Sequence, residues 1–162
     1  NDLGNLSQRV LSMIFKNCDG VMPALPAEPR DEDAALLASA DAMLDAVRAQ
    51  IDLQAFHEVL RVIWQVVSDA NRYVDNTAPW GLKKTDPPRM QEVLAVLAEV
   101  IRQVAILVQP VMPEATSKML AQLGVPDNAR GFDTIGGALR LPAGHVIDKP
   151  EPVFPRYIVE EA

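Results

Sequence analysis

The chain has 162 residues and a formal net charge of −7, which is enough length for one domain with a substantial core. An acidic chain is not expected to bind nucleic acid non-specifically, because the phosphates repel its field. Hydrophobic residues make up 49% of the sequence but aromatic ones only 5%, and this aliphatic composition favours packed helices over a β-sandwich. No apolar run is long enough to span a bilayer, and nothing at the N-terminus has the pattern of a signal peptide.

Cysteine, histidine and carboxylate patterns argue against a metal site or catalysis. Cys18 is the only cysteine, and His57 and His145 lie far apart, so no internal disulfide or thiolate-based zinc site can form. This cysteine usage fits a cytoplasmic location. No glycine-rich loop follows a strand, and the pair Asp31 and Asp33 is typical of a helix start. A helical enzyme with a site inside its core is an alternative that these patterns support only weakly.

Apolar residues at helical spacing predict helices over residues 2–18, 31–50, 52–75, 86–108 and 113–123. Gly20 is expected to end the first helix in a left-handed conformation, and Asp31 and Asp52 are expected to cap the next two. The fourth helix opens at Asp86, which is followed by two prolines. Since this helix is apolar nearly all round, we expect it at the centre of the bundle.

These helices predict an all-α fold, a bundle of about five helices over residues 1–124. Residues 125–162 are rich in Gly and Pro and are expected to form an irregular C-terminal tail that packs on the bundle within the same domain. A short helix or a small hairpin is expected near 139–146.

Trp80 is the first candidate for binding. It follows Pro79 on what we predict to be a short loop after the third helix, with Lys83 and Lys84 close by. Proline fixes the backbone, so the indole would have a stiff support on which an unpaired nucleic-acid base could stack, a contact worth roughly 1–3 kcal/mol. The alternative is a Trp that folds back to cap the core.

Asn5 and Arg9 form the second candidate. They are four residues apart, so they share one face of the first helix, and this face is not the apolar stripe. An amide offers a donor and an acceptor, and a guanidinium offers a rigid fork of donors. The pair could read the edge of an unstacked base or hold a phosphate, or it could be ordinary solvated surface. Further bases near the two segments, including Arg89, permit a small neutral-to-basic surface on an acidic body.

Several segments resemble the anticodon-binding domain of bacterial methionyl-tRNA synthetases: residues 1–9, 17–20 and 70–80 with the following lysines, and later 109–114 and 149–156. The first segment is shared by the class I synthetases for Leu, Val, Ile and Cys. The Pro79-Trp80 pair and the ending Phe154-Pro155-Arg156 indicate methionine.

The resemblance implies a helical bundle that reads the CAU anticodon of methionine tRNA. Trp80 would stack on the first anticodon base, a cytosine, while Asn5 and Arg9 would hydrogen-bond to that base or its neighbour. Pro79 would shape the support. Candidates for phosphate contacts are Lys16, Arg72, Lys83 and Lys84.

The class I nucleotide-binding fold and its His-Ile-Gly-His-like and Lys-Met-Ser-Lys-Ser-like signatures are not in this sequence. The chain itself is therefore expected to hold no cofactor and to perform no catalysis. The resemblance implies ATP, and raises zinc as a candidate, for the catalytic part of a longer parent protein. Asn1 in place of an initiator Met fits a piece of such a parent, and equally a processed or recombinant start.

The expected partners are the anticodon loop of methionine tRNA and the catalytic domain of the same polypeptide, with no membrane or DNA partner. Two alternatives stay open. One is the same domain from a sister class I synthetase, and the other is a helical protein–protein interaction module that binds no RNA.

Overall fold

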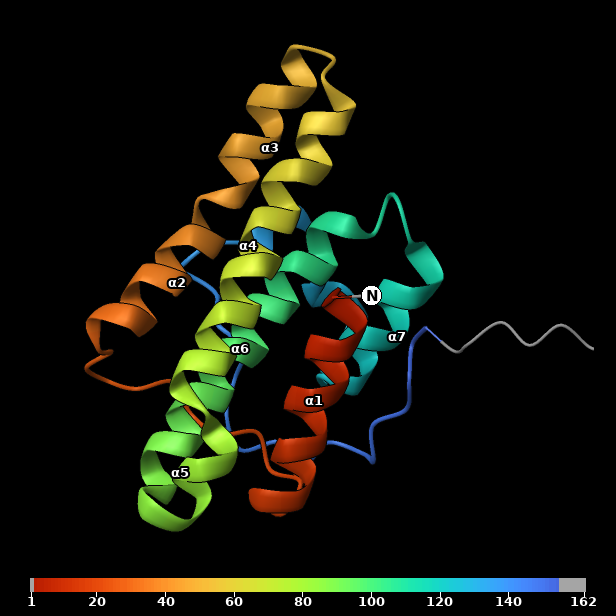
Figure 1. Cartoon of the computed structure of the whole chain (residues 1–162). Helices are drawn as coiled ribbons and strands as arrows, with labels where there is room; N and C mark the ends of the chain where they lie inside the picture. The colour runs from red at the N-terminus through yellow and green to blue at the C-terminus, as the bar shows by residue number, and fades with distance from the viewer. Residues whose placement is uncertain (1, 155–162) are drawn as a thin grey trace, which may run out of the picture.

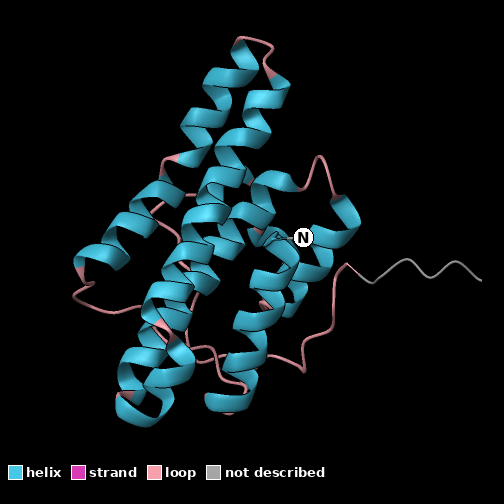
Figure 2. Ribbon diagram, in the orientation of Figure 1, coloured by secondary structure: helices cyan, strands magenta, loops and turns pink. Residues whose placement is uncertain are grey.

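The structure, a computed structural model, describes residues 2–154. Over this range the chain is helical (Figures 1 and 2), and the predicted all-α class is confirmed. The α-helices are α1 (Asp2–Asn17), α2 (Asp31–Asp41), α3 (Met43–Asp52), α4 (Phe56–Thr77), α5 (Pro79–Thr85), α6 (Pro87–Val108) and α7 (Pro113–Gln122), followed by 3-10 turns at Asp127–Ala129 and Phe132–Thr134. All five predicted helices are present, one of them divided into α2 and α3, and α5 is additional.

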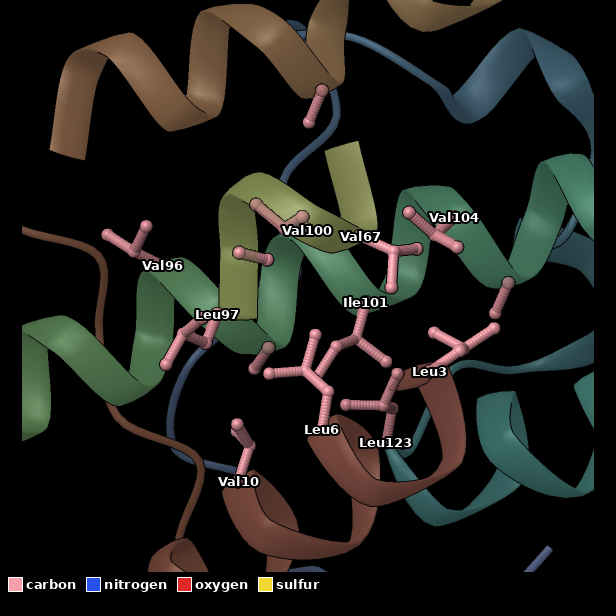
Figure 3. Packing of buried hydrophobic residues seen from close by; sticks show 14 of the residues in the cluster. Leu3, Leu6, Val10, Val67, Val96, Leu97, Val100, Ile101, Val104 and Leu123 are labelled. Carbon is pink, nitrogen blue, oxygen red and sulfur yellow. The ribbon is translucent and has the colours of Figure 1, made fainter. Parts of the chain in front are cut away.

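Helix α6 is the centre of the bundle, as its all-round apolar sequence predicted. It contacts α1, α2, α4, α5 and α7, and every residue from Val93 to Val108 is buried. Figure 3 shows how its aliphatic side chains meet those of α1, α4 and the end of α7; the labelled residues are Leu3, Leu6, Val10, Val67, Val96, Leu97, Val100, Ile101, Val104 and Leu123. Burial of this aliphatic surface is the main stabilising term of the fold.

Two predicted helix boundaries are confirmed by their local geometry. Gly20 has a φ of 70°, and the preceding Asp19 is also left-handed with a φ of 53°. Asp86 caps α6, because its side chain accepts the backbone N–H of Arg89 at 3.1 Å and the two prolines occupy the first turn.

Two predicted caps were wrong. Asp31 is the first residue of α2 rather than its cap, and Asp33 instead accepts the backbone N–H of Arg30 at 3.2 Å. Asp52 is the last residue of α3; a turn follows in which Gln54 has a φ of 57°, and α4 begins only at Phe56. Carboxylates favour both a cap and the first helical turn, so composition alone did not fix the position of Asp31. For Asp52, the left-handed turn at Gln54 separates this residue from the start of α4.

The segment after α7 forms no hairpin near 139–146 within the described residues, so that expectation was wrong. Val146 instead makes an isolated antiparallel bridge to Val21, in the connection after α1. Arg102 of α6 holds the tail by donating to the carbonyl oxygens of Thr134 at 3.0 Å and Leu139 at 2.8 Å. Beside the bridge, the backbone N–H groups of Gly144 and Ile147 donate to the carbonyl oxygens of Met22 and Gly20 at 2.9 and 2.8 Å, so this part of the tail bonds to the connection after α1.

Helices α3 and α4 extend beyond the rest of the bundle as an antiparallel pair (Figure 1). At the opposite end of α4 the chain enters α5, so the two ends of this 22-residue helix lie on opposite sides of the molecule. None of the described helices has the length and apolar content needed to cross a membrane.

Candidate nucleic-acid interface

The predicted face of α1 lies outside the core. Leu3, Leu6 and Val10 are buried, whereas Asn5 is exposed and the Arg9 side chain keeps 35% of its surface accessible. The two polar residues are therefore available on the side of the helix that the spacing predicted.

Arg9 is fixed by the C-terminal half of α4. Its Nη1 donates to Asp75 Oδ1 at 3.2 Å and its Nη2 donates to Asn71 Oδ1 at 3.3 Å. Asn71 is itself oriented, because its Nδ2 donates to the carbonyl oxygen of Val67 at 2.9 Å. The guanidinium is thus held against the end of α4 that leads into Trp80.

Asn71 and Asp75 were missed as site residues by sequence reasoning. Both lie in the segment before Trp80, four residues apart and hence on one helix face. That spacing was a signal, but only the packing of α1 against α4 shows that this face meets Arg9.

Helix α4 ends in a compact turn that presents Trp80. Thr77 donates its hydroxyl to the carbonyl oxygen of Tyr73 at 2.8 Å, and Ala78 adopts a left-handed conformation with a φ of 43°. Pro79 is buried and begins α5, and Trp80 follows with 51% of its surface exposed. The indole is therefore not a buried cap on the core.

The predicted short loop at Trp80 was wrong, because Pro79–Thr85 forms the helix α5. Proline suits the first helical position, where its φ is already helical and its missing N–H removes nothing. Helix α5 packs against α6. Trp80 thus stands on the first turn of a packed helix, a stiffer support than a loop.

The predicted cations do not form one patch. Lys16 is exposed in the last turn of α1, and Lys83 and Lys84 are exposed in the last turn of α5. Arg72 pairs with Asp69 at 3.4 Å and lines a groove of about 350 Å³ between α2 and α4. It therefore faces a different side of α4 from the side that holds Arg9.

Arg89, expected among the surface bases, is buried. Its guanidinium donates to both carboxylate oxygens of Asp33, at 2.6 and 2.7 Å, and the Tyr73 hydroxyl donates to the same carboxylate at 2.6 Å. This cluster joins α2, α4 and α6, and it contacts α4 at Tyr73, about one turn before the end of that helix. It is a structural anchor for the helix that carries the candidate site.

The electrostatics of the cluster follow from these bonds. Burial acts to raise the pKa of Asp33, but hydrogen bonds from Arg89, Tyr73 and the N–H of Arg30 outweigh it, and the pKa lies below its ordinary value. Burial and the bond to Asp33 raise the pKa of Tyr73. The bond to Asp33 raises the pKa of Arg89, so the pair stays charged.

Among the described residues, no group of three or more His, Cys, Asp or Glu side chains is placed to hold a metal ion. The described part of the chain also contains no parallel sheet or glycine-rich phosphate loop. The half-exposed indole of Trp80 offers a surface for stacking, and the Arg9 guanidinium offers oriented N–H donors.

Comparison with known proteins gives consistent results. Residues 24–162 match the model of a family described as the anticodon binding domain of methionyl tRNA ligase. The chain is 50% identical over 162 residues to the methionine–tRNA ligase of Rhizobium meliloti, covering all of this chain and 31% of that protein. It is 47% identical to the Mycobacterium tuberculosis methionine–tRNA ligase, over 97% of this chain and 30% of that protein.

Solved structures agree. The apo form of Mycobacterium tuberculosis methionyl-tRNA synthetase superposes with a TM-score of 0.92 at 46% identity, over 99% of this chain and 32% of that one. The same enzyme bound by methionyl-adenylate gives a TM-score of 0.91. The chain thus spans about 31% of the length of the first relative that it matches. It belongs to the family of anticodon-binding domains of methionyl-tRNA ligases.

Proposed function

We propose that this chain recognises the CAU anticodon of methionine tRNA as part of a longer methionine–tRNA ligase. The observation that carries the proposal is the half-exposed indole of Trp80, which directly follows the end of α4 to which Arg9 is bonded. RNA-binding proteins read unstacked bases by stacking them on aromatic rings and by hydrogen bonds to their edges. The family relationship supplies the identity of the RNA.

Each site residue has a proposed role. Trp80 stacks on the first anticodon base, and Asn5 and Arg9 hydrogen-bond to that cytosine or its neighbour. Pro79, buried at the start of α5, holds the backbone of Trp80 in place. Two N–H groups of Arg9 donate to side chains of α4. The remaining N–H groups, which these bonds orient, would contact the RNA.

Phosphate contacts are proposed for the exposed lysines around this end of the bundle. Lys83 and Lys84 follow Trp80 within α5, and Lys16 lies in the last turn of α1. Arg72 is assigned the same role on the neighbouring groove. Because the chain has a net charge of −7, electrostatic attraction to RNA must come from these local charges, and we expect the affinity to fall with salt.

The parent protein is proposed to be an ATP-dependent ligase that works in the cytoplasm, where translation takes place. ATP would bind its catalytic part, which is the second partner of this chain. Zinc gains no support from the comparisons, so it is not proposed, and neither a membrane nor DNA is proposed as a partner. We further propose that residues 1–124 and 125–162 act as one domain, since Arg102 bonds the two.

The test is a titration of the parent protein with anticodon stem-loops. We expect the CAU stem-loop to bind more tightly than one with a changed first base, and Arg9→Ala to weaken CAU binding by about 1–3 kcal/mol with a smaller loss on the changed RNA. Arg48→Ala, which alters a similarly paired but distant arginine, is the control. Equal losses on both RNAs would reduce Arg9 to a phosphate contact, and equal affinity for all stem-loops would contradict the proposal.

A further inference from the structure

The groove between α2 and α4 lies beside the last turns of α4. Its volume of about 350 Å³ is at the small end of the range of ligand sites. On each helix the lining residues are spaced three and four apart, so they form one stripe that faces the other helix. We call it the α2–α4 groove and define it by Glu32, Leu36, Asp69, Arg72, Tyr73 and Asn76.

The floor of the groove is apolar and its rim is polar. Leu36 and Tyr73 are both buried, and so they form the floor. At the rim, the Arg72 side chain keeps 66% of its surface accessible, and Asn76 is exposed. A guanidinium offers several N–H donors, and an amide offers both a donor and an acceptor. An apolar floor with polar groups around it suits a flat heterocycle such as an unpaired nucleic-acid base.

The two carboxylates of the groove favour an amino group over a phosphate. Glu32 accepts from Arg89 at 2.8 Å, and Asp69 pairs with Arg72 at 3.4 Å. Each carboxylate thus has a cationic partner and keeps further lone pairs for an incoming N–H group. A phosphate inside the groove would be repelled by both carboxylates, whereas the exocyclic amino group of cytosine or adenine is a donor. The groove is therefore suited to a base that carries such an amino group.

The groove and the proposed stacking site lie at the same end of α4 but on different sides of this helix. Asn76 precedes Trp80 by four residues, whereas Arg72 faces away from the side that holds Arg9. In Figure 1, α4 runs between α2 and α1. A helix with its side chains is about 10–12 Å across, so an RNA loop bound at Trp80 reaches the groove by passing round the end of α4.

We propose that the α2–α4 groove binds a second unpaired base of the same RNA loop, one that lies outside the CAU triplet and carries an exocyclic amino group. The triplet itself does not supply this base, because its cytosine and the neighbouring adenine are assigned to the side of α4 that faces α1, and its uracil has no amino group. The base lies on the apolar floor, its amino group donates to Glu32 or Asp69, and Arg72 bonds the attached phosphate at the rim. The Asn76 amide completes the contacts to the base edge. This inference rests on the proposed function, from which it takes the RNA, and it adds a second point of contact that fixes the path of the loop round α4.

The experiment is a double-mutant cycle between the groove and the RNA, carried out in the full-length parent. Each loop nucleotide outside CAU is made abasic in turn, and the affinity for the stem-loop is measured by fluorescence anisotropy. We expect one such position to cost about tenfold in affinity, as the loss of one bound base does. Replacement of the base at that position by uracil, which lacks the amino group, should weaken binding as well.

Ser39→Trp fills the groove, because Ser39 lines it on the α2 side. This variant should lose about tenfold in affinity for the intact RNA and nothing more when the critical nucleotide is abasic, since both changes remove the same contact. Ala38→Trp, at an exposed neighbouring position outside the lining, is the matched control and should keep the full effect of the abasic RNA. Losses in Ser39→Trp that multiply with the abasic loss at every position would overturn the inference, and so would the absence of any sensitive position.

A second variant keeps the test valid if the melting temperature shows that Ser39→Trp misfolds. Asn76→Ala removes the rim amide from an exposed position, and the abasic replacement should cost less in this variant than in the unsubstituted parent. An equal cost would overturn the inference. Equilibrium dialysis tests a different occupant: adenosine binding that Ser39→Trp removes and Ala38→Trp retains would assign the groove to a free nucleoside, which also overturns it. Discrimination of the first anticodon base, titrated separately, reports only on the proposed function.

Discussion

Arg9 on α1 donates to Asp75 on α4 at 3.2 Å, although the two residues are 66 positions apart in the sequence. The pair is partly open to solvent, with side-chain exposures of 35% and 65%. This contact places a guanidinium proposed to bind RNA beside a carboxylate that repels RNA. Asp75 therefore orients Arg9 and at the same time weakens the attraction of this surface for any phosphate.

Asp75→Asn separates these two effects. The free energy of unfolding should change by less than about 1 kcal/mol, because the ion pair is exposed. Binding of a stem-loop with a changed first base should tighten more than binding of the CAU stem-loop, because non-specific repulsion is removed while Arg9 loses a fixed partner. Thermal melting measures the stability, and titration with the two stem-loops measures the affinities. Asp45→Asn, which breaks the exposed pair with Arg48, should alter neither, and unchanged discrimination in Asp75→Asn would contradict the orienting role.

Arg89→Met tests the buried anchor behind the site. It should lower the free energy of unfolding by about 3–5 kcal/mol, because it leaves the fully buried Asp33 carboxylate without its cationic partner. Chemical denaturation of the chain measures the loss. Arg48→Met, at an exposed ion pair, is the control and should cost less than about 1 kcal/mol. A loss for Arg89→Met no larger than the control would mean that the cluster does not anchor α4.

The same cluster predicts a dependence of stability on pH. The pKa of Asp33 is lower in the folded state than its ordinary value of 3.8, so the unfolded chain binds its proton first as the pH falls. The contribution of Asp33 is complete above that ordinary value and is lost as the pH falls below it toward the native value. Denaturation at a series of acidic pH values should show a shallower decline for Asp33→Asn, which starts from a lower stability. Parallel curves would contradict the assignment.

Substitution by alanine should have opposite effects on stability at Gly124 and at Gly81. Gly124 follows α7 with a φ of +76°, and a Cβ there would meet the His145 ring at 2.5 Å. Gly124→Ala should therefore destabilise by at least about 1 kcal/mol. Gly81 lies inside α5, where an added Cβ meets nothing within 4 Å, so Gly81→Ala should stabilise by about 0.5–1 kcal/mol. Melting temperatures that move in the same direction for both would contradict this account.

Local signals in the sequence were sufficient for much of the fold. Gly20, the Asp86 cap with its two prolines, and the all-round apolar α6 each depend on neighbours in the chain, and each was predicted correctly. The break between α2 and α3 at Ala42 has no such signal, since no Gly or Pro marks it. Asp41, just before the break, is bonded to Arg140 at 2.6 Å, a partner that only the folded chain brings near.

The candidate site was likewise predictable from the sequence only in part. Helical spacing placed Asn5 and Arg9 outside the core, and Pro79 marked the change of direction before Trp80. The carboxylate beside Arg9 and the burial of Arg89 could not be predicted, because both depend on which helix faces meet. A lone arginine after an Asp-Pro-Pro start has the same local pattern whether it is solvated or, as here, bonded to Asp33.

The most direct test of the central claim is the affinity of the parent for the CAU stem-loop when Trp80 is replaced. Trp80→Ala should weaken binding by roughly 1–3 kcal/mol and leave the melting temperature nearly unchanged, because half of the indole is solvated. Trp80→Phe should restore part of the affinity, and Phe132→Ala, at an exposed aromatic of the tail, should bind as the unsubstituted protein does. Unchanged affinity together with a large fall in melting temperature would contradict the account and make Trp80 a packing residue.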